Sequence, residues 1–261
     1  MTMMLDAEPT REAPLDGRGL DHSLSASLAK KPVLIVLHME GAKSGHVGRW
    51  FIETGYPLDI RRPFLGDPLP ETLAHHTGAV IFGGSQSAND DVDYVKREVD
   101  WVGVALKEQK PYLGICLGAQ MLARHLGSRV EMCGHGRVEI GYHPVQQIDQ
   151  GRVLGQLPGH VYQWHREGFE LPRGADLLAT SDGAFENQAF LYGPAALGVQ
   201  FHPEIMHTQI NCWSGSNPVR LLMRGAHARH EQLAAHLVHA PHVHSWLDQM
   251  LRRWVEGRLT T

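Results

Sequence analysis

The most constraining feature of this chain is the pentapeptide 114–118, which reads Gly-Ile-Cys-Leu-Gly. An apolar run over 111–115 predicts a short buried strand, and the run 117–126 predicts a helix that ends at Gly127. A G-x-C-x-G sequence at such a junction is the cysteine form of a nucleophile elbow, because glycines leave room for the sharp turn. The turn places the sulfur at a helix N-terminus, where free N–H groups favour a thiolate. The pattern predicts a cysteine-dependent acyl-transfer enzyme.

A thiolate nucleophile needs a base, and the base needs a group that orients it. The stretch 198–204, Gly-Val-Gln-Phe-His-Pro-Glu, offers both at the end of another apolar strand. His202 and Glu204 are two residues apart, so they share a face in extended chain, and Pro203 stiffens the corner between them. We therefore expect Glu204 to hold one nitrogen of the His202 ring while the other nitrogen faces Cys116.

Together these stretches resemble the class I (triad-type) glutamine amidotransferases. The likeness is strongest to stand-alone members that are similar to the amidotransferase domain of GMP synthase. It runs from about residue 32 to about residue 254 and includes five further short stretches: 82–85, 139–145, 163–165, 178–181 and 187–190. The resemblance implies an α/β fold and hydrolysis of the glutamine side-chain amide.

The resemblance also implies a role for each residue of the predicted triad. Cys116 attacks the amide carbonyl, forms a γ-glutamyl thioester and releases ammonia, after which water hydrolyses the thioester and frees the enzyme. His202 protonates the departing ammonia and later activates water, and Glu204 orients His202. The N–H groups of Leu117 and Gly84 are the candidate donors to the oxyanion of the tetrahedral intermediate.

Further residues are expected to contact the substrate. Gly83 adjoins Gly84 in the loop after a predicted strand, where glycine lets the backbone approach the substrate. Gln120 follows Cys116 by one helical turn on the same face, at the position that contacts bound glutamine in the resembled family. Trp164, His165 and Arg166 match the place where backbone atoms of that family hold the amino-acid end of the substrate.

The chain departs from the resembled family at two of these places. Ser85 stands where the family usually has proline, which puts the detailed shape of the loop after Gly84 in question. His165-Arg166-Glu167 stands where many relatives read His-Gly-Asp. The second departure indicates that the acceptor side of the chemistry differs.

Composition excludes several classes of function. The 261 residues are 43% hydrophobic, which is enough for a sizeable core, and the net charge is −4 with both signs interspersed. No apolar run approaches the roughly 20 residues that span a bilayer, and the start of the chain does not read as a secretory signal. We expect a cytoplasmic protein that binds neither nucleic acid nor membrane.

Neither cysteines nor histidines predict a metal site or any cofactor. Cys116, Cys133 and Cys212 form no C-x-x-C pair and are odd in number, so a disulfide framework is not expected. Cys133 and Cys212 are expected to be buried or in loops. Six late histidines are spaced so that some share a helical face, but no carboxylate or cysteine completes a site, and we expect a solvated polar face: His227, His230, His236, His239, His242 and His244.

The order of apolar runs predicts the fold class. Strands are expected at 32–38, 57–62 and 78–82, with helices at 47–55 and 91–108. This alternation predicts a single doubly wound, mostly parallel sheet flanked by helices, in the flavodoxin-like style. Residues 128–200 predict a β-rich extension of the same sheet, and 219–236 and 244–255 predict C-terminal helices. We expect one domain over 31–261 after a flexible extension over 1–30.

Three functions remain open at this point. The first is a glutaminase or amidotransferase subunit; because the chain carries no P-loop, a partner enzyme must then supply the acceptor site for ammonia. The second is a γ-glutamyl hydrolase that cuts a γ-glutamyl amide or peptide with the same triad. The third is a catalytically silent regulatory protein of the same fold, against which the intact Cys116, His202 and Glu204 argue.

Overall fold

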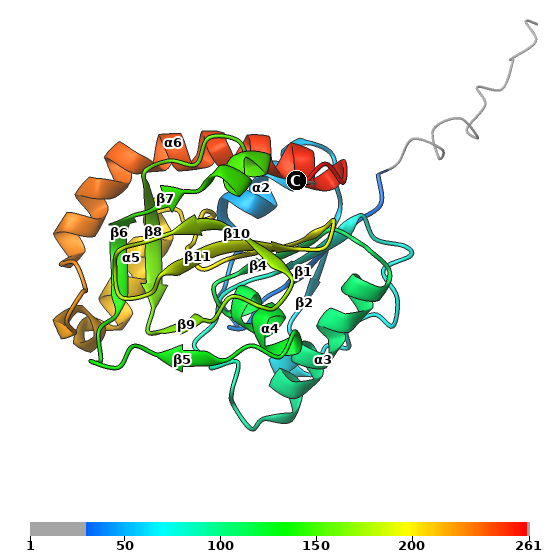
Figure 1. Cartoon of the computed structure of the whole chain (residues 1–261), viewed down its shortest axis with the longest axis horizontal. Helices are drawn as coiled ribbons and strands as arrows, with labels where there is room; N and C mark the ends of the chain where they lie inside the picture. The colour runs from blue at the N-terminus through cyan, green and yellow to red at the C-terminus, as the bar shows by residue number, and fades with distance from the viewer. Residues whose placement is uncertain (1–29, 260–261) are drawn as a thin grey trace, which may run out of the picture.

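A computed structural model describes residues 30–259 (Figure 1), so the predicted N-terminal extension lies almost entirely outside the described residues. At its centre is an eight-stranded sheet. In spatial order its strands are β2 (Leu58–Arg61), β1 (Val33–Val36), β3 (Gly78–Ile81), β4 (Tyr112–Ile115), β12 (Ala196–Val199), β11 (Asn187–Tyr192), β10 (Ala175–Thr180) and β7 (Gln146–Gln147). The first five are parallel, and the last three continue the sheet in antiparallel fashion.

Helices cover both faces of the parallel strands. Helices α3 (Asp93–Lys107) and α4 (Leu117–His125) lie on one face, and α2 (Gly45–Glu53) and α6 (Arg229–Val255) on the other. In β1, alternate residues pack toward α2 and α6 or toward α3 and α4, and all four are buried. A strand buried on both faces is a continuous apolar run, which is why these strands were readable from the sequence. The predicted doubly wound α/β class is confirmed.

The second half of the chain differs from the prediction of one extended sheet. Strands β7, β10 and β11 do extend the central sheet, but four others form two separate pairs: β5 (Val130–Met132) with β9 (Glu167–Phe169), and β6 (Glu139–Pro144) with β8 (His160–His165). The β6–β8 pair leaves the sheet because its Tyr142 and Tyr162 belong to a separate apolar cluster. That cluster includes residues of α5 (His207–Ser216) and α6.

The C-terminal region also corrects the prediction. The structure has the unpredicted α5 and a single 27-residue α6, where we expected two helices over 219–236 and 244–255. Pro241 lies inside α6 and removes one backbone donor. Helix α6 continues through it because Ala240, Val243 and Trp246 are buried on the side that faces the protein. Three short 3₁₀ helices complete the fold: η1 (Pro63–Leu65), η2 (Asp149–Leu154) and η3 (Pro218–Leu222).

Most of the late histidines do not form the solvated face that we expected. His236 is buried, and its Nδ1 lies 2.8 Å from the hydroxyl of Tyr142. Other rings stack in pairs that join separate elements, at centroid distances of 4.0, 4.6 and 4.6 Å: His46–His244, His143–His227 and His160–His239. Among residues 30–259 no group of three or more side chains is placed to hold a metal ion.

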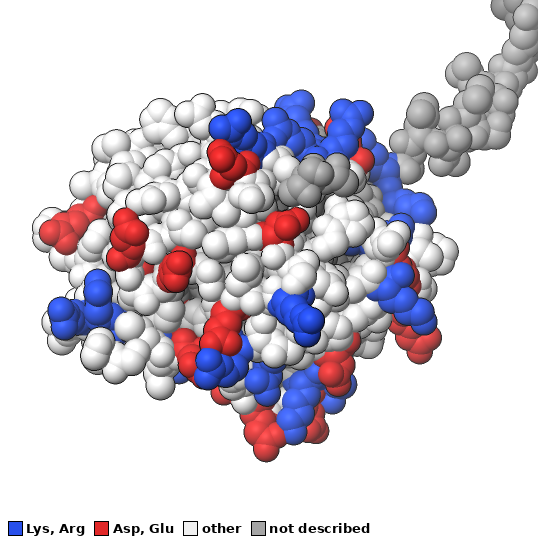
Figure 2. All heavy atoms as spheres, viewed as in Figure 1, with Lys and Arg blue, Asp and Glu red and all other residues white. Residues whose placement is uncertain are grey.

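The surface carries no single-sign field on the face seen in Figure 2. Acidic and basic side chains are mixed along its lower edge, and the surface over the first part of α6 is largely uncharged. Cys133 lies in a loop as expected, whereas Cys212 is exposed on α5. None of the described helices has the length and apolar character needed to cross a membrane.

The buried histidines predict an acid-sensitive fold. Burial, His244 and His207 lower the pKa of His236 to about 4, so below pH 6.5 the unfolded chain takes up this proton first and stability is lost as the pH falls toward 4. Both proteins should become less stable between pH 7 and pH 5. We expect the fall in the free energy of unfolding to be about 1 kcal/mol smaller for His236→Gln, whose amide can still bond Tyr142, after allowance for solvent screening. Urea unfolding at both pH values measures this difference. An equal loss in both proteins would contradict the assignment.

Candidate active site

The elbow predicted around Cys116 is present and strained. Strand β4 ends at Ile115, Cys116 takes φ 51° and ψ −104°, and α4 begins at the next residue. A positive φ is uncommon in a residue with a side chain, and it directs the sulfur away from the strand. Gly114 and Gly118 make this turn possible: a Cβ at Gly114 would lie 2.5 Å from the Gly118 carbonyl carbon, and one at Gly118 would lie 2.1 Å from the Ile81 carbonyl oxygen.

His202 and Glu204 meet, but not through an extended chain as expected. They follow β12 in a turn, in which His202 Nδ1 lies 2.8 Å from Glu204 Oε1. Both side chains are buried. The Glu204 backbone is held by α2, because its carbonyl accepts the His46 N–H at 2.8 Å and Gly45 leaves space for that approach.

Cys116 and His202 face each other beside Gly83. A Cβ on Gly83 would lie 2.6 Å from His202 Cε1 and 3.4 Å from Cys116 Cβ, so any side chain there would displace the pair. Burial opposes a charge on His202, but the Glu204 carboxylate and the Cys116 sulfur overcome it and raise the pKa of His202 to about 10. Trp213 packs edge-on against the imidazole at 5.1 Å. The arrangement stabilises an imidazolium between the Glu204 carboxylate and the Cys116 sulfur.

The loop that carries Gly83 and Gly84 is fixed from behind by a buried pair. His38 Nδ1 lies 3.3 Å from the Gly83 carbonyl, and His38 Nε2 lies 2.7 Å from the Glu98 carboxylate. Both His38 and Glu98 are buried. Gly84 and Leu117 lie on the same cleft as Cys116, as a pair of oxyanion donors requires.

A small cleft opens beside the sulfur, where the carboxyl ends of β3, β4 and β12 meet. This edge of an open α/β sheet is where ligands usually bind. Its wall contains seven residues that the sequence singled out: Gly84, Cys116, Leu117, Gln120, Trp164, His165 and Arg166. It also contains four residues that were not among the predicted site residues: Ser85, Gln86, Glu167 and Arg220. Nothing in the local pattern around Arg220 marks it as a site residue.

Gln120 is buried in this wall and is bonded on both sides. Its amide donates to the carbonyl of Glu167 at 2.8 Å and lies 3.2 Å from Gln200 Oε1. These bonds tie α4 to the start of β9 and to the residue that follows β12. Gln120 is therefore not an exposed helix glutamine, which would be the usual expectation for this residue type.

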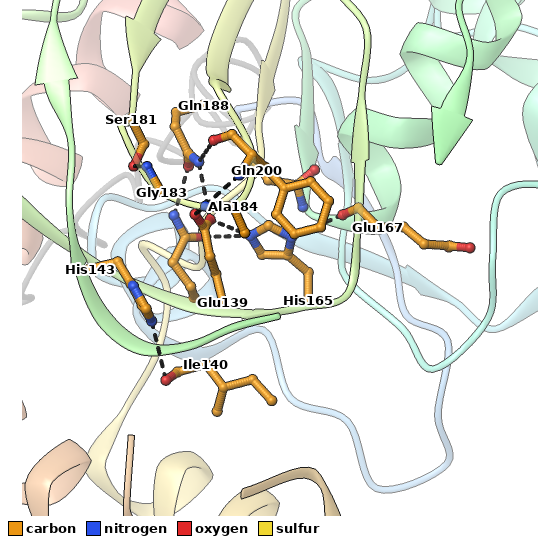
Figure 3. A network of polar contacts seen from close by, with 12 residues as sticks. Glu139, Ile140, His143, His165, Glu167, Ser181, Gly183, Ala184, Gln188 and Gln200 are labelled. Carbon is orange, nitrogen blue, oxygen red and sulfur yellow. Dashed lines mark hydrogen bonds and ion pairs between the residues drawn. The ribbon is translucent and has the colours of Figure 1, made fainter. Parts of the chain in front are cut away.

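His165 turns its ring away from the cleft into a buried polar network (Figure 3). Its Nδ1 lies 2.9 Å from the Glu167 carbonyl, and its Nε2 lies 3.1 Å from a Glu139 oxygen. Glu139 also accepts the Ala184 N–H at 2.9 Å and the Gln188 amide at 3.2 Å. Although burial opposes the charge, the bond from His165 holds the pKa of Glu139 below its usual range. The network fixes the backbone of 164–167, so this segment offers the cleft a rigid wall.

Comparison with known proteins decides the family. The family model Glutamine amidotransferase class-I matches residues 50–212. The chain belongs to this family. Among curated class I relatives, the glutamine amidotransferase-like protein YfeJ of Salmonella typhimurium is 29% identical over 183 residues, which cover 66% of this chain and 75% of YfeJ.

Two further comparisons agree with this family. A subunit of the glutamine-hydrolyzing GMP synthase of Sulfurisphaera tokodaii is 32% identical over 156 residues, which cover 58% of this chain and 80% of that protein. The crystal structure of a glutamine amidotransferase from Thermotoga maritima superimposes with a TM-score of 0.78 at 30% identity, covering 86% of this chain and 98% of that one. The predicted resemblance to stand-alone class I glutamine amidotransferases is confirmed.

The elbow geometry predicts the effect of adding one methyl group at Gly118. Its Cβ would enter the Ile81 carbonyl, so we expect Gly118→Ala to lower the free energy of unfolding by about 3 kcal/mol or more and to displace Cys116. Gly134→Ala is the matched control, because a Cβ there meets nothing within 4 Å. Thermal unfolding and the rate of Cys116 alkylation measure both effects. Equal stability of the two variants would contradict the packing described here.

Proposed function

We propose that this chain is a glutaminase of the amidotransferase type, which hydrolyses the side-chain amide of glutamine and delivers ammonia to an acceptor. The observation that carries the proposal is the placement of His202 between Cys116 and Glu204, with its pKa raised to about 10. An imidazolium beside a thiol stabilises the thiolate, which is the nucleophilic form. Nothing in the packing of the fold requires a buried group of this kind.

The proposed reaction uses the groups on the cleft in sequence. The Cys116 thiolate attacks the γ-carbonyl carbon, and the oxyanion forms between the N–H groups of Gly84 and Leu117. His202 gives its proton to the leaving nitrogen, so ammonia departs and a γ-glutamyl thioester remains. Neutral His202 then takes a proton from water, whose oxygen attacks the thioester, and glutamate and the thiolate are released.

Relatives support the use of the ammonia by a second protein. The Sulfurisphaera tokodaii relative is named as one subunit of a glutamine-hydrolyzing GMP synthase. By extension, we propose that this chain also works with a partner that supplies the acceptor site. The departure at Arg166 and Glu167, both on the wall of the cleft, fits an acceptor side that differs from that of the relatives.

Substrate choice distinguishes this proposal from a γ-glutamyl hydrolase. We expect purified protein to release equal amounts of ammonia and glutamate from L-glutamine, and Cys116→Ala to abolish turnover while unfolding at the parent's temperature. The same assays with γ-glutamyl methylamide and γ-glutamyl dipeptides provide the comparison. Turnover of the substituted amides but not of L-glutamine would contradict the glutaminase and support a γ-glutamyl hydrolase.

Alkylation of Cys116 tests whether the site is competent for catalysis without any substrate. Iodoacetamide should modify Cys116 at pH 7 much faster than the exposed Cys212, and 6-diazo-5-oxo-norleucine, a glutamine analogue, should label Cys116 as well. Folded protein in which Cys116 resists both reagents would favour a catalytically silent relative.

A further inference from the structure

Arg220 is a half-buried cation on the wall of the cleft that contains Cys116. It belongs to η3, and the class I family match ends eight residues earlier, at residue 212. Among residues 30–259 its guanidinium pairs with no carboxylate: the groups that shift its pKa are Arg166 and Cys116, with no acid among them. Glu167 shares the wall, but its Oε1 accepts the Ser87 hydroxyl at 3.1 Å.

A second guanidinium faces the same cleft. Arg166 is exposed on the segment that the buried Glu139–His165 network holds rigid. Burial and the like charge of Arg166 lower the pKa of Arg220, whereas the nearby sulfur of Cys116 raises it. Two arginines of like charge on one cleft, neither of them in an ion pair within residues 30–259, gain most when an anion binds both, because guanidinium groups bind carboxylates in forked geometry.

The segment that carries Arg220 is anchored to β6. The Arg224 carbonyl accepts the Val138 N–H at 3.0 Å, and the Ile140 carbonyl accepts the His227 N–H at 2.9 Å. Gly225 has φ 99°, and a Cβ there would lie 2.1 Å from the Val138 carbonyl oxygen, so only glycine permits this approach. The backbone that follows Arg220 is therefore held in place before any ligand arrives.

These observations identify the ligand group by its charge and its reach. In a γ-glutamyl compound three carbons separate the amide carbon from the α-carboxylate, so a substrate whose amide meets Cys116 presents its carboxylate to the wall of the same cleft. We propose that Arg220, together with Arg166, binds the α-carboxylate of the γ-glutamyl substrate and thereby selects amides that have it free. This inference rests on the proposed glutaminase site.

The test compares two substrates that differ only at that group. L-Glutamine has a free α-carboxylate, and L-glutamine α-amide has the same γ-carboxamide without the charge. We expect Arg220→Met to lower kcat/KM for L-glutamine by about 10- to 100-fold, mainly through KM, and to leave kcat/KM for the α-amide nearly unchanged. Arg220→Lys should restore part of the loss. Arg224→Met is the matched control, since this exposed arginine lies off the cleft and should leave both values unchanged.

A binding assay separates this inference from the proposed function. L-Glutamine should slow alkylation of Cys116 by iodoacetamide in the parent protein, whereas it should protect the Arg220→Met variant at least tenfold less well at equal concentration. If protection depends on Arg220 but L-glutamine is not turned over, the carboxylate site stands and the proposed glutaminase activity is overturned. Turnover that is unchanged in Arg220→Met, equal losses for both substrates, or absence of any protection would overturn the carboxylate site.

Discussion

The chemistry that we propose depends on one buried interaction, the contact of the His202 imidazole with Cys116 on one side and Glu204 on the other. Each of these groups is nearly excluded from water, where an isolated charge would be strongly disfavoured. Together they place the His202 ring between a carboxylate and a sulfur, so a positive charge on the ring is stabilised from both sides. Because Glu204 and Cys116 act on the same imidazole, replacing one of them changes the effect of replacing the other. We therefore expect the three residues to behave as a unit rather than as independent contributors.

The fold makes this contact by bringing three chain segments to one edge of the sheet. The loop after β3 contributes Gly83, the elbow after β4 contributes Cys116, and the turn after β12 contributes His202. Glycine is needed where these segments pass each other, because a Cβ at Gly83, Gly114 or Gly118 would collide with its neighbours. Rigid supports behind the cleft, the His38–Glu98 pair and the Glu139–His165 network, hold the surrounding loops in place.

Much of this arrangement could be predicted from local sequence. Strands that are buried on both faces leave continuous apolar runs, and the elbow requires glycines at fixed spacing around Cys116. Features that depend on long-range packing could not be predicted in this way. The single helix through Pro241 is stabilised by tertiary burial, and the stacked histidine pairs join residues that are far apart in the sequence. Arg220 reaches the cleft through the anchoring of a distant segment, and no motif surrounds it.

The protonation of the His202 ring can be followed directly in solution. NMR titration of ¹³C-histidine-labelled protein, with His202 assigned by its loss in His202→Gln, would follow that ring from pH 5 to pH 11. We expect His202 to remain protonated through pH 8 and to titrate near pH 10, and we expect Cys116→Ala and Glu204→Gln each to lower this midpoint. A ring that is neutral at pH 7 in the parent protein, or a midpoint that neither substitution moves, would contradict this expectation.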